Sequence, residues 1–136
     1  MIEATVGVAI NAIALSKRSN SVAVAGSTEI KIFNIDTVAK KISEANYLPF
    51  KSTGNFTVTD IVWCNCDANE GGKIAASASN GHMQVFNAAR SGKEKGKERL
   101  REWNNAEASR FIHKLSWHAS DPNIIAAACQ GDKLLP

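Results

Sequence analysis

The sequence lacks the features that mark several large classes of protein. No apolar run approaches the roughly 20 residues that a membrane-spanning helix needs. Residues 1–4 lack the basic start of a signal peptide, and no long apolar core follows them. The chain has 3 cysteines, and this odd number argues against a disulfide framework. These absences exclude membrane-spanning and disulfide-rich classes and predict a cytoplasmic chain with reduced thiols.

The cysteines also offer little to a metal ion. Cys64 and Cys66 are two positions apart, and Cys129 is distant. Structural zinc sites take four ligands, often as two Cys-x-x-Cys pairs or as one such pair with two histidines. No second cysteine pair follows in this chain. We therefore predict no metal site and no cofactor.

The net charge is small, with a formal value of +3, and charged residues make up an ordinary 21% of the chain. The basic residues concentrate in one segment, where glutamates dilute the local field. We predict a solvated loop there, because no aromatic stacking platform accompanies the charges. A nucleic-acid or anionic-lipid patch is the alternative. Its candidate residues are Lys93, Lys95, Lys97, Arg99 and Arg101.

Catalytic motifs are absent as well. Neither G-x-S-x-G nor H-E-x-x-H occurs in the sequence. His82 follows an Asn-Gly turn, His113 lies in a predicted strand, and His118 lies at a predicted turn. None of them has a nucleophile motif nearby, and a triad needs three converging groups. We interpret all three histidines as turn or surface residues.

Asp60 is the acidic residue that needs a separate interpretation. A catalytic acid would need a partner carboxylate, and Asp67 and Glu70 lie in a predicted loop. We interpret Asp60 as a structural acid, which would stabilise the fold by roughly 0.5–1.5 kcal/mol if it is buried and hydrogen-bonded. The segment 71–73, Gly-Gly-Lys, lacks the rest of a phosphate-binding loop. We therefore expect that the chain is not an enzyme.

Short segments with two-fold apolar periodicity are present instead. They are rich in alanine and β-branched residues and are bounded by turn residues, which is typical of strands. The segment 37–45 could also form a short helix, since Val38, Ile42 and Ala45 share a helical face; the context favours a strand. We expect loops over 46–56 and 88–98. The clearest strand segments are 21–26, 29–35, 58–63 and 83–87.

One turn carries a specific geometric signal. Asn80-Gly81 lies between two predicted strands. Asn-Gly is typical of a two-residue hairpin of type I′, because that turn needs positive φ at both central residues. We predict this hairpin.

The strand pattern repeats along the chain. The pairs Phe33-Asn34 and Phe86-Asn87 lie 53 residues apart, and Trp63 and Trp117 lie 54 apart. A third copy begins at residue 112 and continues to residue 129. The same period in two comparisons indicates one repeated structural unit.

The order of features within the repeat predicts the blade of a β-propeller. Inner strands crowd around a central channel and favour small residues, whereas large rings pack between neighbouring sheets. The small residues are Ala75, Ala76, Ala126 and Ala127. The structural blade residues that we single out are Phe33, Asn34, Trp63, Phe86, Asn87 and Trp117.

These motifs resemble the WD40 repeat. The two Phe-Asn pairs stand where that family usually has Trp-Asp. The segment 77–81, Ser-Ala-Ser-Asn-Gly, is similar to its Ser-Gly-Ser-x-Asp-Gly hairpin, and 117–119, Trp-His-Ala, is similar to its Trp-His-Pro turn. The usual Gly-His dipeptide is absent, so the hydrogen-bond network that pins a typical blade is incomplete here.

Residues 8–132 together resemble the N-terminal blades of the RING-bearing WD-repeat subunit of the GATOR (yeast SEA) complex. The resemblance implies an all-β propeller segment of about two and a half blades, at about 8–45, 57–102 and 110–132, with no second domain. It also implies a protein-interaction scaffold for other subunits, in amino-acid signalling to the target-of-rapamycin kinase at the lysosomal (vacuolar) surface. The alternative is a nucleic-acid- or chromatin-associated WD40 protein that uses the basic segment 93–101.

Three structural expectations follow. We expect two complete four-stranded sheets and a third that stops after two strands, since 131–136 departs from the repeat. We expect Trp63 and Trp117 to be buried and Trp103 less so. We interpret residues 2–6 as the strand that closes a propeller, and a truncated chain with open faces would aggregate or bind a hydrophobic dye.

Overall fold

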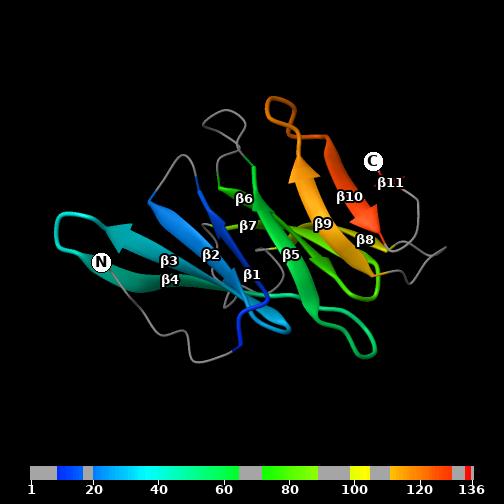
Figure 1. The fold of residues 1–136 in the computed structure, drawn as a ribbon, viewed down its shortest axis with the longest axis horizontal. Helices are drawn as coiled ribbons and strands as arrows, with labels where there is room; N and C mark the ends of the chain where they lie inside the picture. Colours follow the sequence, from blue (N-terminus) through cyan, green and yellow to red (C-terminus); the bar gives the residue numbers. More distant parts are fainter. Residues whose placement is uncertain are drawn as a thin grey trace.

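The computed structural model describes residues 9–16, 20–64, 72–88, 99–104, 111–129 and 134–135. Within these ranges all regular structure is β-strand, arranged in three antiparallel sheets (Figure 1). This confirms the predicted all-β fold. The proposed closing strand at 2–6 lies outside the described residues.

Each sheet is a simple meander of strands that are consecutive in the chain. Sheet 1 consists of β1 (Ala12–Leu15), β2 (Ser21–Ala25), β3 (Glu29–Asp36) and β4 (Lys41–Pro49). Sheet 2 consists of β5 (Val58–Trp63), β6 (Lys73–Ala78), β7 (His82–Asn87) and β8 (Arg99–Asn104). Sheet 3 consists of β9 (Ile112–Trp117), β10 (Ile125–Cys129) and the short β11 (Leu134–Leu135). The expectation that the third sheet stops after two strands is therefore wrong by one strand.

The segment 37–45 forms a turn and a strand, as the context favoured. The Asp36 carboxylate accepts hydrogen bonds from the backbone N–H groups of Val38 and Ala39, both at 3.0 Å. Lys40 adopts a left-handed conformation, with φ of 54°. These contacts reverse the chain, and β4 then pairs with β3 as far as Pro49. The loop expected over 46–56 therefore begins only at residue 50.

The turn at Asn80-Gly81 differs from the type I′ prediction. Among the described residues of this turn, only Gly81 has positive φ, at 87°. The loop has three residues, 79–81, and the Gly81 N–H donates to the Ala78 carbonyl at 3.2 Å. The Ser79 N–H donates to the Thr57 carbonyl at 2.9 Å, which continues the pairing of β5 and β6 to the first residue of the loop. A left-handed Gly81 then closes the three-residue loop, as in the common hairpin in which an αL residue follows a type I turn.

The three sheets are packed face to face through their inner strands. Strand β5 lies against β1 and β2, and β9 lies against β5 and β6 (Figure 1). The outer strands β4 and β8 lie far from this seam in the sheet order. The alanine-rich strands β2, β6 and β10 pair with the innermost strands β1, β5 and β9. Their small side chains leave room for the neighbouring sheet.

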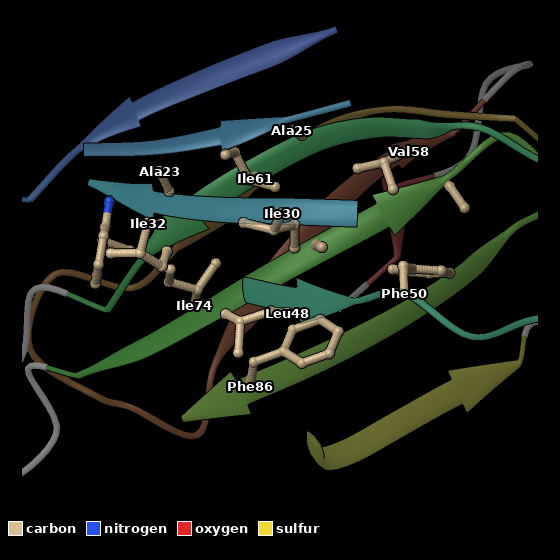
Figure 2. Close-up of a cluster of buried hydrophobic side chains, with 13 residues drawn as sticks. Ala23, Ala25, Ile30, Ile32, Leu48, Phe50, Val58, Ile61, Ile74 and Phe86 are labelled. Carbon is tan, nitrogen blue, oxygen red and sulfur yellow. The ribbon is translucent and has the colours of Figure 1, made fainter. Parts of the chain in front are cut away.

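A large apolar cluster fills the space between sheets 1 and 2. Both sheets contribute small and large apolar side chains to it, and the aromatic rings of Trp63 and Phe86 come from sheet 2 (Figure 2). Its fully buried members include Ile30, Leu48, Ile74 and Phe86. A second cluster between sheets 2 and 3 includes Ala75, Val85, Ile112, Leu115 and Ala127. Burial of these side chains, at about 1.5–3 kcal/mol for each large one, holds the sheets together.

The two equivalent tryptophans behave differently. Trp63 is buried, as predicted, and its indole N–H donates across the interface to the Ala14 carbonyl at 2.9 Å. Trp117 is only partly buried, so the prediction of burial is wrong for it. Its indole N–H donates to the Pro122 carbonyl of its own turn at 3.1 Å rather than across to the preceding sheet, and the ring packs against the edge of the cluster between sheets 2 and 3. The side chain of Trp103 lies outside the described residues.

Candidate interaction surface at the hairpin end

One end of sheets 1 and 2 gathers the turns 26–28 and 79–81 and the inter-sheet loop 50–57; we call it the hairpin end. The loop is tied to sheet 1 by two backbone bonds. The Phe50 N–H donates to the Thr28 carbonyl at 3.0 Å, and the Val58 N–H donates to the Ser27 carbonyl at 2.7 Å. Both turns and the loop therefore form one continuous surface.

Gln84 fastens the start of this loop to sheet 2. Its side chain is 1% exposed and lies on β7, on the same face as Phe86. The amide N–H donates to the Lys51 carbonyl, and the amide oxygen accepts the Lys51 N–H at 3.3 Å. The Gln84 side chain thus pairs with both backbone groups of Lys51, as a neighbouring strand would, in a partly buried position.

A second fastening joins the middle of the loop to the 79–81 turn. Ser52 Oγ lies 2.6 Å from His82 Nδ1, and the Asn80 side-chain amide donates to the same Oγ at 2.8 Å. The Asn80 oxygen accepts the His82 backbone N–H at 3.2 Å. A nucleophilic serine needs a base that a third group orients. Asn80 instead engages the hydroxyl itself, so this arrangement holds the loop.

The end of the loop is fastened a third time. The Thr57 N–H donates to Ser79 Oγ at 3.0 Å. From sheet 1, the Asn11 side-chain amide donates to Thr57 Oγ1 at 2.7 Å and to the Val58 carbonyl at 3.0 Å. The loop therefore bridges the two sheets, and its conformation depends on both of them.

The exposed side chains of the hairpin end carry hydroxyl, amide and ammonium groups. They belong to Ser27, Thr28, Lys51, Thr53 and Asn55. Such groups donate and accept hydrogen bonds without a strong local field. Because the loop is fastened at three points, it would lose little conformational freedom on binding a partner.

One ionisable group at this end is perturbed. Tyr47 lies near the end of β4, and its cross-strand neighbourhood includes Glu29 at the start of β3. Burial, a side-chain hydrogen bond with Glu29 and the negative charge of that carboxylate all raise the pKa of Tyr47 above its usual value of 10.0. The phenol is therefore neutral throughout the physiological pH range.

The Phe-Asn pairs occupy equivalent positions in sheets 1 and 2. Phe33 and Phe86 are both buried, near the ends of β3 and β7. Phe86 lies in the cluster between sheets 1 and 2. Asn34 is exposed, and its side-chain oxygen lies 3.1 Å from Ser21 Oγ on the adjacent strand. Asn87 lies opposite Lys73 on β6, as Asn34 lies opposite Ser21 on β2, and Asn87 is partly buried.

The basic segment is only partly a loop. Arg99 and Arg101 belong to β8, so the loop expected over 93–101 ends earlier than predicted. Arg101 is exposed. Lys93, Lys95 and Lys97 lie outside the described residues. Strand β7 begins at the hairpin end, and the antiparallel strand β8 runs back towards it. The last residue of β7 and the first residue of β8, which flank the basic segment, therefore lie at the opposite end of sheet 2.

The structure does not bring the other candidate residues together. Among the described residues, no three side chains of His, Cys, Asp or Glu come close enough to hold a metal ion. His113 and His118 are exposed, whereas Cys64 and Cys129 are buried free cysteines. Cys66, Asp67 and Glu70 lie outside the described ranges. No helix in the described part of the chain is long and apolar enough to cross a membrane.

Asp60 lies buried in β5 and joins two sheets. Its carboxylate accepts the Leu115 N–H of β9 at 2.8 Å. The sequence interpretation as a structural acid agrees with this contact, although the partner is the next inner strand. The pairing of β5 with β6 shifts register between Val58 and Asp60, so Asp60 lies directly beside an irregular position of the strand.

Replacing Asp60 by alanine is expected to lower the free energy of unfolding by about 1–3 kcal/mol, because the Leu115 N–H would be left buried without an acceptor. Asp60→Asn keeps an oxygen at the site and should cost less. Urea unfolding of both variants measures the difference. Equal losses for both variants would contradict a role as hydrogen-bond acceptor.

Three solved structures share this arrangement of sheets. The C-terminal WD40 domain of Sif2 matches with a TM-score of 0.66 at 16% identity, over 87% of this chain and 30% of that one. Sqt1 of Chaetomium thermophilum matches at 0.65 and 14% identity, over 87% and 29%. A chain of a mitotic checkpoint complex matches at 0.63 and 16% identity, over 96% and 34%. The chain has the fold of WD40 propeller blades.

The WD40 likeness extends to sequence. GATOR2 complex protein Wdr24 of Drosophila melanogaster is 29% identical over 121 residues, which is 88% of this chain. The match covers 14% of the fly protein, so the chain spans a small part of that relative. No profile of a known protein family matches the chain. The predicted resemblance to a WD-repeat subunit of the GATOR complex is thereby confirmed.

The sequence did not predict the hydrogen bonds that hold the loop 50–57 against these WD40 blades. Gln84 and Ser52 were not among the candidate residues. A signal for Gln84 was available, because it is a polar residue on the strand face that it shares with Phe86. Ser52 offered none, since its partners His82 and Asn80 lie 28 or more positions away.

Proposed function

We propose that this chain is a non-catalytic protein-interaction scaffold and a subunit of a GATOR/SEA-type complex in amino-acid signalling to the target-of-rapamycin kinase. The WD40 fold and the likeness to Wdr24 support the proposal. On this proposal the partners are other protein subunits, and there is no small-molecule substrate. The chain acts in the cytoplasm or at the lysosomal membrane surface, without inserting into the membrane. The three sheets act as successive blades of one propeller segment.

The fastened loop 50–57 is the observation that carries the proposal. Gln84, Asn80 and Ser79 hold its backbone or side chains, while Thr53 and Asn55 project from it as exposed residues. A partner that docks on a preorganised loop pays a smaller entropic cost than one that must order a free loop. We therefore place the partner at the hairpin end.

The proposal predicts selective loss of partners from a hairpin-end variant. The tagged chain is recovered from its own cells, and GATOR-type subunits are quantified by immunoblotting. Thr53→Lys with Asn55→Lys should reduce their recovery at least about tenfold, by analogy with the loss of a central polar contact. Val38→Lys is the control, because Val38 is exposed in the 37–40 turn at the other end of sheet 1.

Two outcomes would contradict this proposal. If the double variant recovers the subunits as well as the wild-type chain does, the partner docks elsewhere. If recovery of the bound material falls steeply with salt and nucleic acid is its main component, the nucleic-acid alternative replaces the scaffold. Phosphate contacts weaken with salt, whereas a protein interface of ordinary polarity does not weaken to the same degree.

A further inference from the structure

The turn 79–81 contains the one Asn-Gly dipeptide of the sequence, and such a dipeptide rearranges without an enzyme. The backbone nitrogen of Gly81 loses its proton and bonds to the side-chain amide carbon of Asn80. The bond from that carbon to Nδ2 breaks, Nδ2 takes up a proton, and ammonia leaves. Water then opens the cyclic imide at either carbonyl, which leaves aspartate or isoaspartate. Glycine favours the attack because no Cβ obstructs its nitrogen.

In the closed turn, the reacting groups are engaged in hydrogen bonds. The Gly81 N–H donates to the Ala78 carbonyl at 3.2 Å. The Asn80 side-chain amide donates to Ser52 Oγ at 2.8 Å, and its oxygen accepts the His82 N–H at 3.2 Å. The attack needs the Asn80 side chain to turn towards the Gly81 nitrogen, so these bonds must break first. The reaction therefore proceeds from the open turn, whose population is set by local stability.

The opening of this turn is coupled to the loop 50–57. Ser52, which accepts the Asn80 amide, belongs to the loop, and the preceding residue Lys51 is held by Gln84 on β7. Asn80 is therefore released when this part of the loop moves away. Asn55 offers an internal comparison, because it is exposed in the same loop but is followed by a phenylalanine, whose side chain obstructs the attack.

Deamidation would change the contacts that fasten the loop. The Ser52 hydroxyl accepts from Asn80 and has one proton to give to His82 Nδ1, which lies 2.6 Å away. Aspartate has an oxygen in place of Nδ2, and a carboxylate oxygen only accepts. The hydroxyl must then turn its proton away from His82 and towards residue 80. The same carboxylate would also face the Thr53 carbonyl, to which the Asn80 amide donates at 3.5 Å.

Isoaspartate would disturb the turn further. It routes the main chain through the former side chain, which adds a methylene group between the Cα of residue 80 and the nitrogen of Gly81. The short three-residue loop cannot absorb this extra length and also keep the left-handed Gly81 bonded to Ala78. Both products therefore weaken the contact between the turn and the loop.

We propose that Asn80 is a site of spontaneous deamidation, that the fastened loop 50–57 suppresses the reaction, and that the product releases the loop. The modification reinforces itself, because an open loop exposes Asn80 and an acidic residue at this position keeps the loop open. This inference goes beyond the proposed function and does not rest on it, since every contact that it uses lies within the described chain.

The first experiment follows deamidation of Asn80 by peptide mass spectrometry while the full chain is incubated in mildly alkaline buffer. An unstructured peptide of residues 74–90 gives the rate of the open turn. We expect the folded chain to react at least about tenfold more slowly than the peptide, since several hydrogen bonds must open first. Ser52→Ala removes one of these bonds and should react roughly fivefold faster than the wild type. Gln84→Leu should also accelerate the reaction, whereas Asn55 should keep its amide.

The second experiment measures release of the loop by limited trypsin digestion of Asn80→Asp. Trypsin cleaves after Lys51 when the loop opens, and the cleavage rate follows the open population when opening is fast. Cleavage after Lys51 should become roughly fivefold faster, relative to cleavage after Lys40 in the 37–40 turn. Asn55→Asp is the matched control, because it adds the same charge to the same loop without touching its fastening. It should leave the ratio unchanged.

The opposite results overturn the proposal. A peptide that keeps its Asn80 amide shows that the dipeptide is not reactive. Equal rates in the folded chain and the peptide, or a wild-type rate in Ser52→Ala and Gln84→Leu, show that the loop does not suppress the reaction. Unchanged cleavage after Lys51 in Asn80→Asp, or an equal rise in Asn55→Asp, shows that the product does not release the loop. Far-UV circular dichroism checks that the sheets of each variant are formed.

Discussion

Replacing Trp63 by alanine is expected to lower the free energy of unfolding by about 3–5 kcal/mol. The ring is 5% exposed and lies in the cluster between sheets 1 and 2. Its removal leaves a cavity where two sheets meet, and it also leaves the Ala14 carbonyl without the indole N–H at 2.9 Å. The change therefore weakens the contact between sheets as well as sheet 2 itself. Urea unfolding monitored by circular dichroism measures the loss.

Trp117→Ala is the matched control, since Trp117 holds the same position in the next repeat. It is partly buried, and its indole N–H bonds to Pro122 within its own turn. The lost apolar area is smaller, so its cost should be clearly below that of Trp63→Ala. Equal costs for the two variants would mean that the difference in burial has no energetic consequence.

Replacing Gln84 by leucine is expected to release the loop 50–57 and to cost about 1–3 kcal/mol for each Lys51 backbone group that stays buried without a partner. The leucine keeps a similar volume and apolar contacts, so the effect reports the two lost hydrogen bonds. Hydrogen exchange at the Lys51 amide should become faster, and urea unfolding should show the loss of stability.

Lys51→Ala is the control for Gln84→Leu. The Lys51 side chain is exposed, and it is the backbone of this residue that Gln84 binds. Exchange and stability should therefore change little, within about 0.5 kcal/mol. If Gln84→Leu left the exchange at residue 51 unchanged, the loop would be held by the Ser52 and Ser79 contacts without Gln84.

Local pattern was enough to predict most strands. Alternation of apolar residues over 21–26, 29–35 and 58–63 depends only on the geometry of an extended chain, in which successive side chains point to opposite faces. The 53-residue spacing of the Phe-Asn pairs then indicated the stacking of equal units. Strand ends were less accurate: β4 extends to Pro49 and β8 includes Arg99, because pairing with β3 and β7 continues through polar residues.

The candidate surface could not be predicted in the same way. The sequence by itself determined the strand pattern, the repeat and the small or large size of each core-facing residue, since these follow from periodicity within one segment. Only the tertiary structure decided which turn Asn80 forms, where Gln84 and Asp60 find their partners, and why Trp63 is buried while Trp117 is not. Each of these depends on a hydrogen bond between segments that are distant in the chain or on the face of a neighbouring sheet, and no local pattern specifies such a contact.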